Sequence, residues 1–511
     1  MSKVAKILSA TTVGLDSYLV EVEVDIGAGL PSFTIVGLPD KAIDESKERI
    51  RAAIKNSDLF FPQHRLTVNL APADMKKEGP SFDLPMAIGV LLAGEQIPKI
   101  NEYKESLFVG ELALNGELRH VNGILPIAMF AFEQNLKRVY VPAINAEEAS
   151  LISGIEVMPV ENLGQLVAHL RGERLIKSYK VESTKLQRER PDTDTDFALI
   201  AGQEQAKRAL IIAAAGNHNI LLSGPPGSGK TMLARALPSI LPSMDDDEVL
   251  EVTKIHSVAG LLQGQSVLIR ERPFRAPHHT TSGVALIGGG SWPRPGEISL
   301  SHRGVLFLDE FPEFPRSVLE ALRQPLEDGV VTVSRATGSL TFPAEFLLVA
   351  SQNPCPCGFL SDPEKQCNCS PNQIQKYQRK VSGPILDRID IHIEVPRISY
   401  EKLKMSGESE ASGTIRDRID EVRQLQRKRF KGHKCKTNAE MGAKEVKEFC
   451  KLDEEAEKMV ALAVDSMKLS ARVYHRILKL ARTIADLEGC EAIAQNHIAE
   501  ALQYRPKEKQ F

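Results

Sequence analysis

Hydrophobic and polar residues alternate along short segments in the first part of the chain. Strand-like stretches with a two-residue period or a short apolar run occur at 18–26, 32–38, 65–71, 106–114 and 137–142. Apolar residues recur with the helical period at 42–57, 84–97 and 124–135. This alternation of strands and helices predicts an α/β or α+β domain over residues 1–180.

Two changes of pattern divide the rest of the chain. Residues 181–195 are polar and charged without periodicity, which is typical of a linker. A second α/β unit is expected over 196–396. The last part, 397–511, is predicted as a helical domain. It contains a charged stretch with Gly and Ser at 404–418, and from about 440 onward its pattern is helical, with helices at 454–467, 471–489 and 492–505.

Composition changes this picture little. A chain of 511 residues exceeds the size of one hydrophobic core, so several domains are expected. The net charge of −3 means that any contact with nucleic acid needs a local basic surface. We see neither a long apolar run nor a signal peptide, and therefore expect no membrane partner and a cytoplasmic location with reduced thiols.

A glycine-rich loop between a strand and a helix is the strongest chemical signal. The segment GPPGSGKT has the spacing G-x-x-x-x-G-K-T, in which backbone N–H groups surround phosphates at a helix N-terminus. Lys230 would reach the β- and γ-phosphates of ATP, and the Thr231 hydroxyl would hold Mg²⁺. The expected nucleotide-binding residues are Gly224, Pro225, Pro226, Gly227, Ser228, Gly229, Lys230 and Thr231.

Polar residues follow two further apolar strands. Asp309 and Glu310 come after the run 305–308, and Asn353 comes shortly after 346–350. At the carboxyl end of a parallel sheet, Asp309 would hold Mg²⁺ and Glu310 would orient or deprotonate the attacking water. Asn353 is expected to face the γ-phosphate. The alternatives are an exposed acidic pair at a helix start and a plain turn Asn before Pro.

Four of the seven cysteines follow Asn353 closely, in two Cys-x-Cys pairs. They offer the four thiolates that a closed structural Zn²⁺ site needs. Reduced packing cysteines in a turn-rich loop, and a redox or iron–sulfur role, are the other interpretations. The residues concerned are Cys355, Cys357, Cys367 and Cys369.

Taken together, these motifs resemble the AAA+ ATPases, in the branch that contains magnesium-chelatase ATPase subunits and MCM-type helicases. The segments that carry this resemblance are the P-loop, LFLDE, QNP and GPILDRIDIHIEVP, with an insertion over 275–304 and a hairpin over 327–346. The segments NPCPCG, SGPILDRID and ARTIADL are similar to the YifB/ComM family of magnesium chelatase-like bacterial ATPases over essentially the whole chain.

This resemblance implies an α/β fold with an AAA+ P-loop ATPase core at 196–396 and an α-helical C-terminal lid at 397–511. It also implies roles for two arginines. Arg388 matches the arginine finger that acts on the neighbouring subunit's γ-phosphate. Arg472 matches the sensor-2 arginine at the start of a lid helix, with Arg476 as its rival.

The N-terminal domain at 1–180 resembles the Lon protease domain, which has a ribosomal S5 domain 2-like fold. Ser81 falls at the position of the nucleophile, but Pro126 falls where the catalytic lysine should be. A Ser–Lys dyad needs an amine to accept the serine proton. We therefore expect Ser81 to be a helix N-cap rather than a nucleophile, and the domain not to be a peptidase.

Residues for DNA contact are expected in the insertion and at the tip of the hairpin. In a ring both elements would face the pore, where arginines neutralise phosphates and an aromatic side chain stacks on a base. The alternative is that these side chains are solvated or pack within their own domain. The candidates are Arg275, Trp292, Arg294 and Arg335. His278 and His279 in the same insertion are expected to be ordinary loop residues rather than metal ligands.

The family resemblance implies an ATP hydrolase that forms a ring, expected to be a homohexamer, and drives branch migration on DNA during homologous recombination or natural transformation. Its cofactors would be ATP and Mg²⁺, with Zn²⁺ if the cysteine cluster binds metal. The alternatives are a chelatase-like ATPase that remodels a partner protein, a Lon-like peptidase, and a DNA-bound scaffold without activity.

Overall fold

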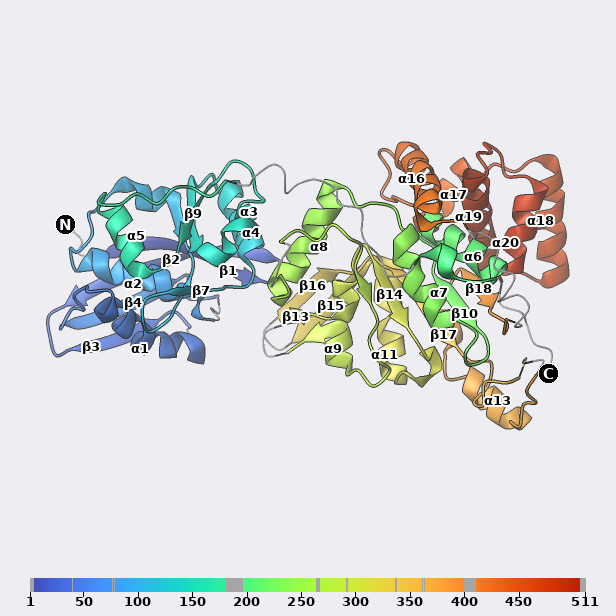
Figure 1. Cartoon of the computed structure of the whole chain (residues 1–511), viewed down its shortest axis with the longest axis horizontal. Helices are drawn as coiled ribbons and strands as arrows, with labels where there is room; N and C mark the ends of the chain where they lie inside the picture. The colour runs from blue at the N-terminus through green and yellow to red at the C-terminus, as the bar shows by residue number, and fades with distance from the viewer. Residues whose placement is uncertain are drawn as a thin grey trace. The chain divides into compact units, whose positions relative to one another are not determined.

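The structure is a computed structural model. It describes residues 4–38, 40–75, 77, 79–180, 196–262, 267–290, 293–335, 338–360, 362, 364–398 and 410–505. The chain divides into two compact units. Figure 1 colours the chain by residue number. Unit 1 comprises residues 1–188 together with 249–269, and unit 2 comprises 189–248 together with 270–511. The boundary at 248 lies inside helix α8 (Asp246–Ala259).

Unit 1 is built on a mixed seven-stranded sheet in the order β3-β4-β2-β1-β5-β8-β9. Its strands are β1 (Ala5–Val13), β2 (Asp16–Gly27), β3 (Ser32–Val36), β4 (Arg65–Ala71), β5 (Ser106–Phe108), β8 (Arg138–Pro142) and β9 (Glu156–Val160). A small separate pair consists of β6 (Glu111–Leu112) and β7 (Leu118–Arg119). The pairs β1–β2 and β2–β4 are antiparallel, and the other neighbours of the large sheet run parallel.

The helices of unit 1 besides α8 are α1 (Lys41–Asn56), α2 (Asp83–Ala93), α3 (Ile124–Glu133), α4 (Ala146–Ala149) and α5 (Leu163–Leu170). Helix α2 is the most buried of them and lies directly on the sheet. A Cβ at Gly89 would stand only 2.5 Å from Cγ2 of Val24, so glycine permits the close approach of α2 to β2. The apolar run from which this helix was predicted therefore belongs to a helix in the core of unit 1.

Unit 2 contains a five-stranded parallel sheet in the order β11-β14-β17-β10-β18. The strands are β11 (Phe274–Arg275), β14 (Val305–Leu308), β17 (Leu347–Gln352), β10 (Ile220–Ser223) and β18 (Ile391–Glu394). Helices α6 (Glu204–Gly216) and α7 (Lys230–Ala236) flank β10 in sequence. Because β14, β17 and β10 are neighbours, the loops after them meet at one edge of the sheet.

The insertion and the predicted hairpin are both formed. The insertion contains α9 (Gly283–Ile287), β12 (Gly288–Gly289), β13 (Arg294–Pro295) and α10 (Glu297–Leu300). The hairpin pairs β15 (Val330–Arg335) with β16 (Gly338–Pro343), and Arg335 lies opposite Gly338. Helices α11 (Arg316–Ala321) and α12 (Arg323–Asp328) connect β14 to the hairpin.

The C-terminal part of unit 2 is helical. It contains α16 (Ser412–Arg429), α17 (Ala443–Phe449), α18 (Glu454–Met467), α19 (Ala471–Leu487) and α20 (Gln495–Gln503), which gather in orange and red in Figure 1. The three predicted helices are confirmed as α18, α19 and α20. Among the described residues, no helix is long and apolar enough to cross a lipid bilayer.

Candidate functional site

The glycine-rich loop forms a compact turn between β10 and α7. Gly227 and Gly229 have φ angles of +75° and +92°, which favour glycine. The buried Lys230 amine donates to the carbonyls of Gly224 and Pro225, both at 2.8 Å, and lies 3.4 Å from Oδ1 of Asn353. Burial lowers the pKa of Lys230, and the nearby Asp309 carboxylate opposes this shift. The arrangement holds an amine at the position where phosphate would enter.

Asp309 is held by hydroxyl groups from two neighbouring elements. The Thr231 hydroxyl donates to its Oδ2 at 2.9 Å, and the Ser351 hydroxyl donates to its Oδ1. Hydroxyl and carboxylate oxygens are the ligands that Mg²⁺ prefers, and Mg²⁺ keeps several of its waters. Thr231 and Asp309 therefore fit a Mg²⁺ that accompanies a nucleotide. Sequence reasoning missed Ser351, although it lies two residues before Asn353.

These groups line one cavity of about 390 Å³. Its lining comes from the ends of β10, β14 and β17: Pro226, Gly227, Ser228, Gly229, Lys230, Thr231, Met232, Asp309, Glu310, Ser351, Gln352 and Asn353. The cavity thus brings together the predicted P-loop residues, the acidic pair and Asn353. Its size and its polar groups suit the phosphate end of a nucleotide.

Glu310 makes a contact that sequence reasoning did not expect. It has a left-handed backbone, with φ of +53°, and its carboxylate Oε2 lies 3.1 Å from Nδ1 of His279. The partner comes from the loop after β11, the strand next to β14. His278, in contrast, has its Nδ1 within 2.8 Å of the Thr280 hydroxyl. No signal in the sequence indicated this pair, because strand β11 has only two residues and was not predicted.

Arg388 and Arg472 converge on one carboxylate. Both form ion pairs with Glu327 of α12, Arg472 at 3.7 Å, and the Arg388 pairing lowers the pKa of Glu327. They line a second cavity, of about 500 Å³, whose lining does not include the P-loop. Glu327 carried no signal in the sequence.

Arg476 has a different environment from Arg472. Its guanidinium is buried and donates to the carbonyls of Ile389 at 3.0 Å and Asp387 at 2.6 Å. It thereby orders the backbone on both sides of Arg388. Burial lowers the pKa of Arg476, with Asp390 and Asp387 opposing. Arg472 retains a half-exposed side chain, which suits contact with a partner.

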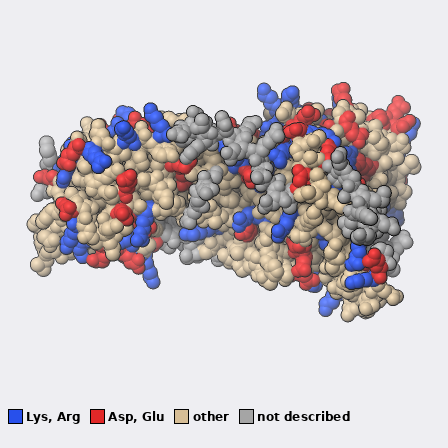
Figure 2. All heavy atoms as spheres, viewed as in Figure 1, with Lys and Arg blue, Asp and Glu red and all other residues tan. Residues whose placement is uncertain are grey.

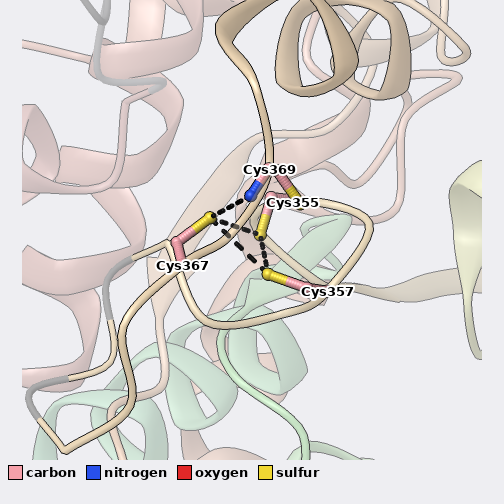
Figure 3. A group of neighbouring side chains, drawn as sticks. All are labelled: Cys355, Cys357, Cys367 and Cys369. Carbon is pink, nitrogen blue, oxygen red and sulfur yellow. Dashed lines mark hydrogen bonds between the residues drawn. The ribbon is translucent and has the colours of Figure 1, made fainter.

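The four cysteines of the 355–369 segment lie together, and we call them the cysteine cluster. The Sγ of Cys355 lies 3.3 Å from that of Cys357 and 3.7 Å from that of Cys367, and the last two are 3.5 Å apart. All four Sγ atoms lie within 4.8 Å of one another. Figure 3 shows the sulfurs of Cys355, Cys357 and Cys367 pointing toward one another. In the described parts of the chain, no other group of three or more potential ligands was found.

Electrostatics within the cysteine cluster favours thiolate at one position. Chiefly through the backbone N–H of Phe359, the pKa of Cys357 is lowered to about 6. A further N–H, that of Cys369, donates to the Sγ of Cys367 at 3.5 Å. The buried Cys355 thiol has a raised pKa because of desolvation. All four cysteines are free thiols rather than disulfides.

The candidates for DNA contact have unequal positions. Arg275 is half-buried, and its Nε and Nη2 donate to the Glu297 carboxylate at 2.6 and 2.8 Å. A phosphate would have to displace Glu297 from it. Arg294 is exposed on β13. Trp292 and the side chain of Arg335 lie outside the described residues.

The expectation that Ser81 caps a helix is wrong. Ser81 lies inside a short 3₁₀ turn, Pro80–Phe82, whose cap is Gly79, and α2 after it has no side-chain cap. The carbonyl of Ser81 accepts a hydrogen bond from the N–H of Gly110 at 2.9 Å, so the turn is fixed by the neighbouring strand segment instead. Pro126, at the position expected for a catalytic lysine, lies in the first turn of α3.

In the parallel sheet, the P-loop follows β10 and the acidic pair follows β14, with β17 between these two strands. This arrangement defines a P-loop nucleoside-triphosphatase of the AAA+ class. Three family models match the chain and specify its branch. They are magnesium chelatase, subunit ChlI, at residues 196–403; subunit ChlI of Mg-chelatase at 22–145; and the C-terminal region of subunit ChlI at 409–505.

Full-length relatives narrow the class to a family. The chain is 45% identical to competence protein ComM of Haemophilus influenzae over 98% of this chain and 97% of the relative. It is 41% identical to the uncharacterized protein YifB of Escherichia coli, over 96% and 95%. The magnesium-chelatase 38 kDa subunit of Cereibacter sphaeroides is 23% identical over 59% of this chain. The chain belongs to the YifB/ComM family of magnesium-chelatase-like AAA+ proteins, and this membership indicates ATPase activity with ATP and Mg²⁺.

Proposed function

We propose that this protein is a ring-forming ATPase, a homohexamer, that moves on DNA and promotes branch migration during recombination or natural transformation. One observation supports the assembly into a ring. Arg388 and Arg472 both pair with Glu327 in a cavity whose lining does not include the P-loop. An arginine that stabilises the γ-phosphate must approach it closely. A neighbouring subunit's P-loop brought to this cavity would supply that phosphate.

Within the nucleotide cavity, each residue has a task suited to its position. Lys230 would leave the loop carbonyls and bind the β- and γ-phosphates, while Thr231 and Asp309 hold the Mg²⁺ that neutralises phosphate charge. Glu310 would turn from His279 and orient or deprotonate the attacking water. Asn353, close to Lys230, would contact the γ-phosphate. These roles together make ATP hydrolysis dependent on a conformational change at Glu310.

DNA is the proposed substrate of the motor for two reasons. One full-length relative is a competence protein, and competence is the uptake of DNA. The insertion offers the exposed Arg294, while the hairpin ends at Arg335. On the face drawn in Figure 2, blue and red side chains are interspersed without a large area of one sign. A ring would concentrate such local basic groups by repeating them around a pore.

Zn²⁺ is the proposed ligand of the cysteine cluster. Four thiolates around one Zn²⁺ at about 2.3 Å stand roughly 3.8 Å apart. The three Sγ separations among Cys355, Cys357 and Cys367, 3.3 to 3.7 Å, are close to that value, and the Sγ of Cys369 lies within 4.8 Å of the other three. A DNA motor would work in the cytoplasm, where thiols stay reduced and available for metal.

Two other functions have weaker support. A chelatase-like ATPase acting on a partner protein would use the same nucleotide site without DNA. A peptidase would need a base near Ser81, but the nearby buried Lys77 donates its amine to the Pro72 carbonyl. The amine of Lys77, the described lysine next before Ser81 in the sequence, is therefore not available for a Ser–Lys dyad.

DNA-dependent stimulation of ATP hydrolysis tests the proposal. We expect the purified full-length protein to hydrolyse ATP several-fold faster with branched or single-stranded DNA than without it. Its Arg294→Glu variant should lose that stimulation while keeping basal hydrolysis. A basal rate that no DNA changes would favour the chelatase-like alternative.

A further inference from the structure

The turn that carries the first two cysteines lies against the phosphate-binding loop. Gly358 has a φ of +84°, and a Cβ at this position would stand 2.5 Å from Cδ and 2.7 Å from Cγ of Pro226. Pro226 lines the nucleotide cavity. Real Cβ atoms do not approach other atoms this closely, so glycine is needed for the contact itself as well as for the left-handed backbone.

The same turn is closed on the cysteine side. The N–H of Gly358 donates to the carbonyl of Cys355 at 3.0 Å. The Sγ of Cys355 is buried against those of Cys357 and Cys367, as Figure 3 shows. A displacement of Cys355 and Cys357 would therefore change the distance between Gly358 and Pro226.

The other end of the cysteine cluster is anchored to a helix. Cys369 is followed directly by Ser370, which caps α13 (Pro371–Gln378) in a capping box with Gln373. From the end of α13, the Gln378 amide donates back to the carbonyl of Pro354 at 3.3 Å. The cysteine cluster thus joins the end of β17, the turn at Gly358 and the start of α13. A cross-link between the two cysteine pairs would reduce the conformational freedom of the loop that joins them.

We propose that a single Zn²⁺ cross-links this loop and thereby braces the P-loop through the contact between Gly358 and Pro226, so that zinc occupancy sets the affinity for ATP. The ligands are Cys355, Cys357, Cys367 and Cys369. This inference rests on the proposed ATPase function only in that ATP is the ligand of the P-loop. Zinc binding closes the loop because the four thiolates must take a tetrahedral arrangement.

Metal content and nucleotide binding test the two halves of the inference separately. The full-length protein, purified without a metal-binding tag, should contain about one Zn²⁺ per chain by elemental analysis. Stripping this zinc with a chelator should weaken the binding of a fluorescent ATP analogue about tenfold or more, and zinc added back should restore it. The Cys357→Ser variant should lose zinc, whereas Cys490→Ser, which removes an exposed thiol that is not part of the cysteine cluster, should keep it.

A glycine substitution tests the brace without removing a ligand. Gly358→Ala should retain zinc yet bind the ATP analogue about tenfold more weakly, because its methyl group displaces Pro226. Gly432→Ala is the matched control, since Gly432 also has a left-handed backbone, with φ of +90°, but a Cβ there meets nothing within 4 Å. Zinc content and thermal melting temperature should be measured for both variants. Weak ATP binding by a Gly358→Ala protein that keeps its zinc and its melting temperature cannot be attributed to general unfolding.

Several results would overturn the inference. Zinc well below one per chain with four titratable thiols, or iron in its place, would remove the zinc site. Unchanged ATP binding by zinc-free protein or by Gly358→Ala would remove the brace. A failure of the proposed function has another signature: wild-type protein with full zinc would bind no ATP, or would hydrolyse ATP without regard to DNA.

Discussion

Single side chains decide how the nucleotide site works, and His279 is the least expected of them. A carboxylate that activates water must be free to face it. Here Glu310 has its Oε2 3.1 Å from the His279 ring. The imidazole belongs to the insertion proposed to contact DNA, so movement of that insertion would reach Glu310 directly. Under the proposed function, DNA binding at the insertion could therefore change the position of Glu310 and so the rate of ATP hydrolysis.

Replacing Glu310 by Gln tests its assignment as the base. The amide keeps the size of the side chain but cannot accept a proton, so hydrolysis should fall by roughly 10²–10⁴-fold while ATP binding is retained. Steady-state hydrolysis and binding of an ATP analogue measure the two effects. Glu313→Gln, at a nearby surface ion pair with Lys380, is the control. A Glu310→Gln protein with the wild-type rate would remove the residue from this role.

Replacing His279 by Ala tests the restraint on Glu310. Without its imidazole partner, Glu310 should turn to water more often, because a partly exposed pair of this kind contributes about 0.2–1 kcal/mol. We expect the rate without DNA to rise several-fold and the stimulation by DNA to shrink. His278→Ala should change both properties less than His279→Ala does, since the His278 ring contacts that of His279, with centroids 4.1 Å apart, while its Nδ1 lies 2.8 Å from the Thr280 hydroxyl. A lower rate without DNA in the His279→Ala protein would contradict the restraint.

At the scale of elements, the helical part is tied to the ATPase core by buried polar groups. Asp486 of α19 accepts hydrogen bonds from Arg429 of α16 at 2.6 and 2.7 Å, from Arg482 at 3.0 Å and from Asn438 at 2.8 Å. Thr483 continues the network to His218 beside β10 at 2.8 Å. The segment ARTIADL owes its polar residues to this network, which sets the position of α19 and of Arg472 at its start.

Removing the central carboxylate should therefore destabilise the protein strongly. Asp486→Ala leaves the buried Arg482 and the partly buried Arg429 without their carboxylate partner, and breaking a buried ion pair in this way costs about 3–5 kcal/mol. Thermal or denaturant unfolding of unit 2 measures this loss. Asp465→Ala, on the exposed face of α18, should change stability by less than about 0.5 kcal/mol. Equal midpoints for the two variants would contradict the network's importance.

Helices and strands could be predicted from the sequence where the hydrophobic residues followed either the helical or the strand period clearly. Helix α18 begins and ends as predicted, at Glu454 and Met467. Helix α16 was missed, because its charged residues outnumber the few that reach the core, Ile415, Ile419 and Val422. Helix α5 and strand β9 were also missed, since both are short.

The candidate site divides in the same way. The P-loop is contiguous in sequence, so its residues could be named from spacing alone, and the structure brings them together with Asp309, Glu310 and Asn353. Glu327 and His279 are brought to their partners by folding alone. No local pattern marks such a residue, because its partner lies far away in the sequence and is not fixed by spacing.

At the scale of the whole molecule, the separation of Arg388 from the P-loop cavity makes a prediction about assemblies. Arg388→Ala and Lys230→Ala should each abolish hydrolysis. When the two proteins are mixed and reassembled, about a quarter of interfaces regain both groups, and activity should partly return. Hydrolysis across mixing ratios measures this. Absence of recovery despite demonstrated co-assembly would mean that Arg388 acts within its own subunit.

Unit 1 is discontinuous in sequence, since residues 249–269 return to it from the middle of the ATPase region. The buried Glu148 carboxylate accepts a hydrogen bond from Ser257 at 2.5 Å, and the N–H of Gly123 donates to the Ser257 carbonyl at 3.2 Å. A gene segment that encoded residues 1–180 alone would leave both groups without their partner Ser257. The N-terminal unit is thus not encoded by one contiguous gene segment that recombination could transfer intact. A lineage that exchanged residues 1–180 alone would lose these contacts unless the coding sequence for 249–269 changed with it.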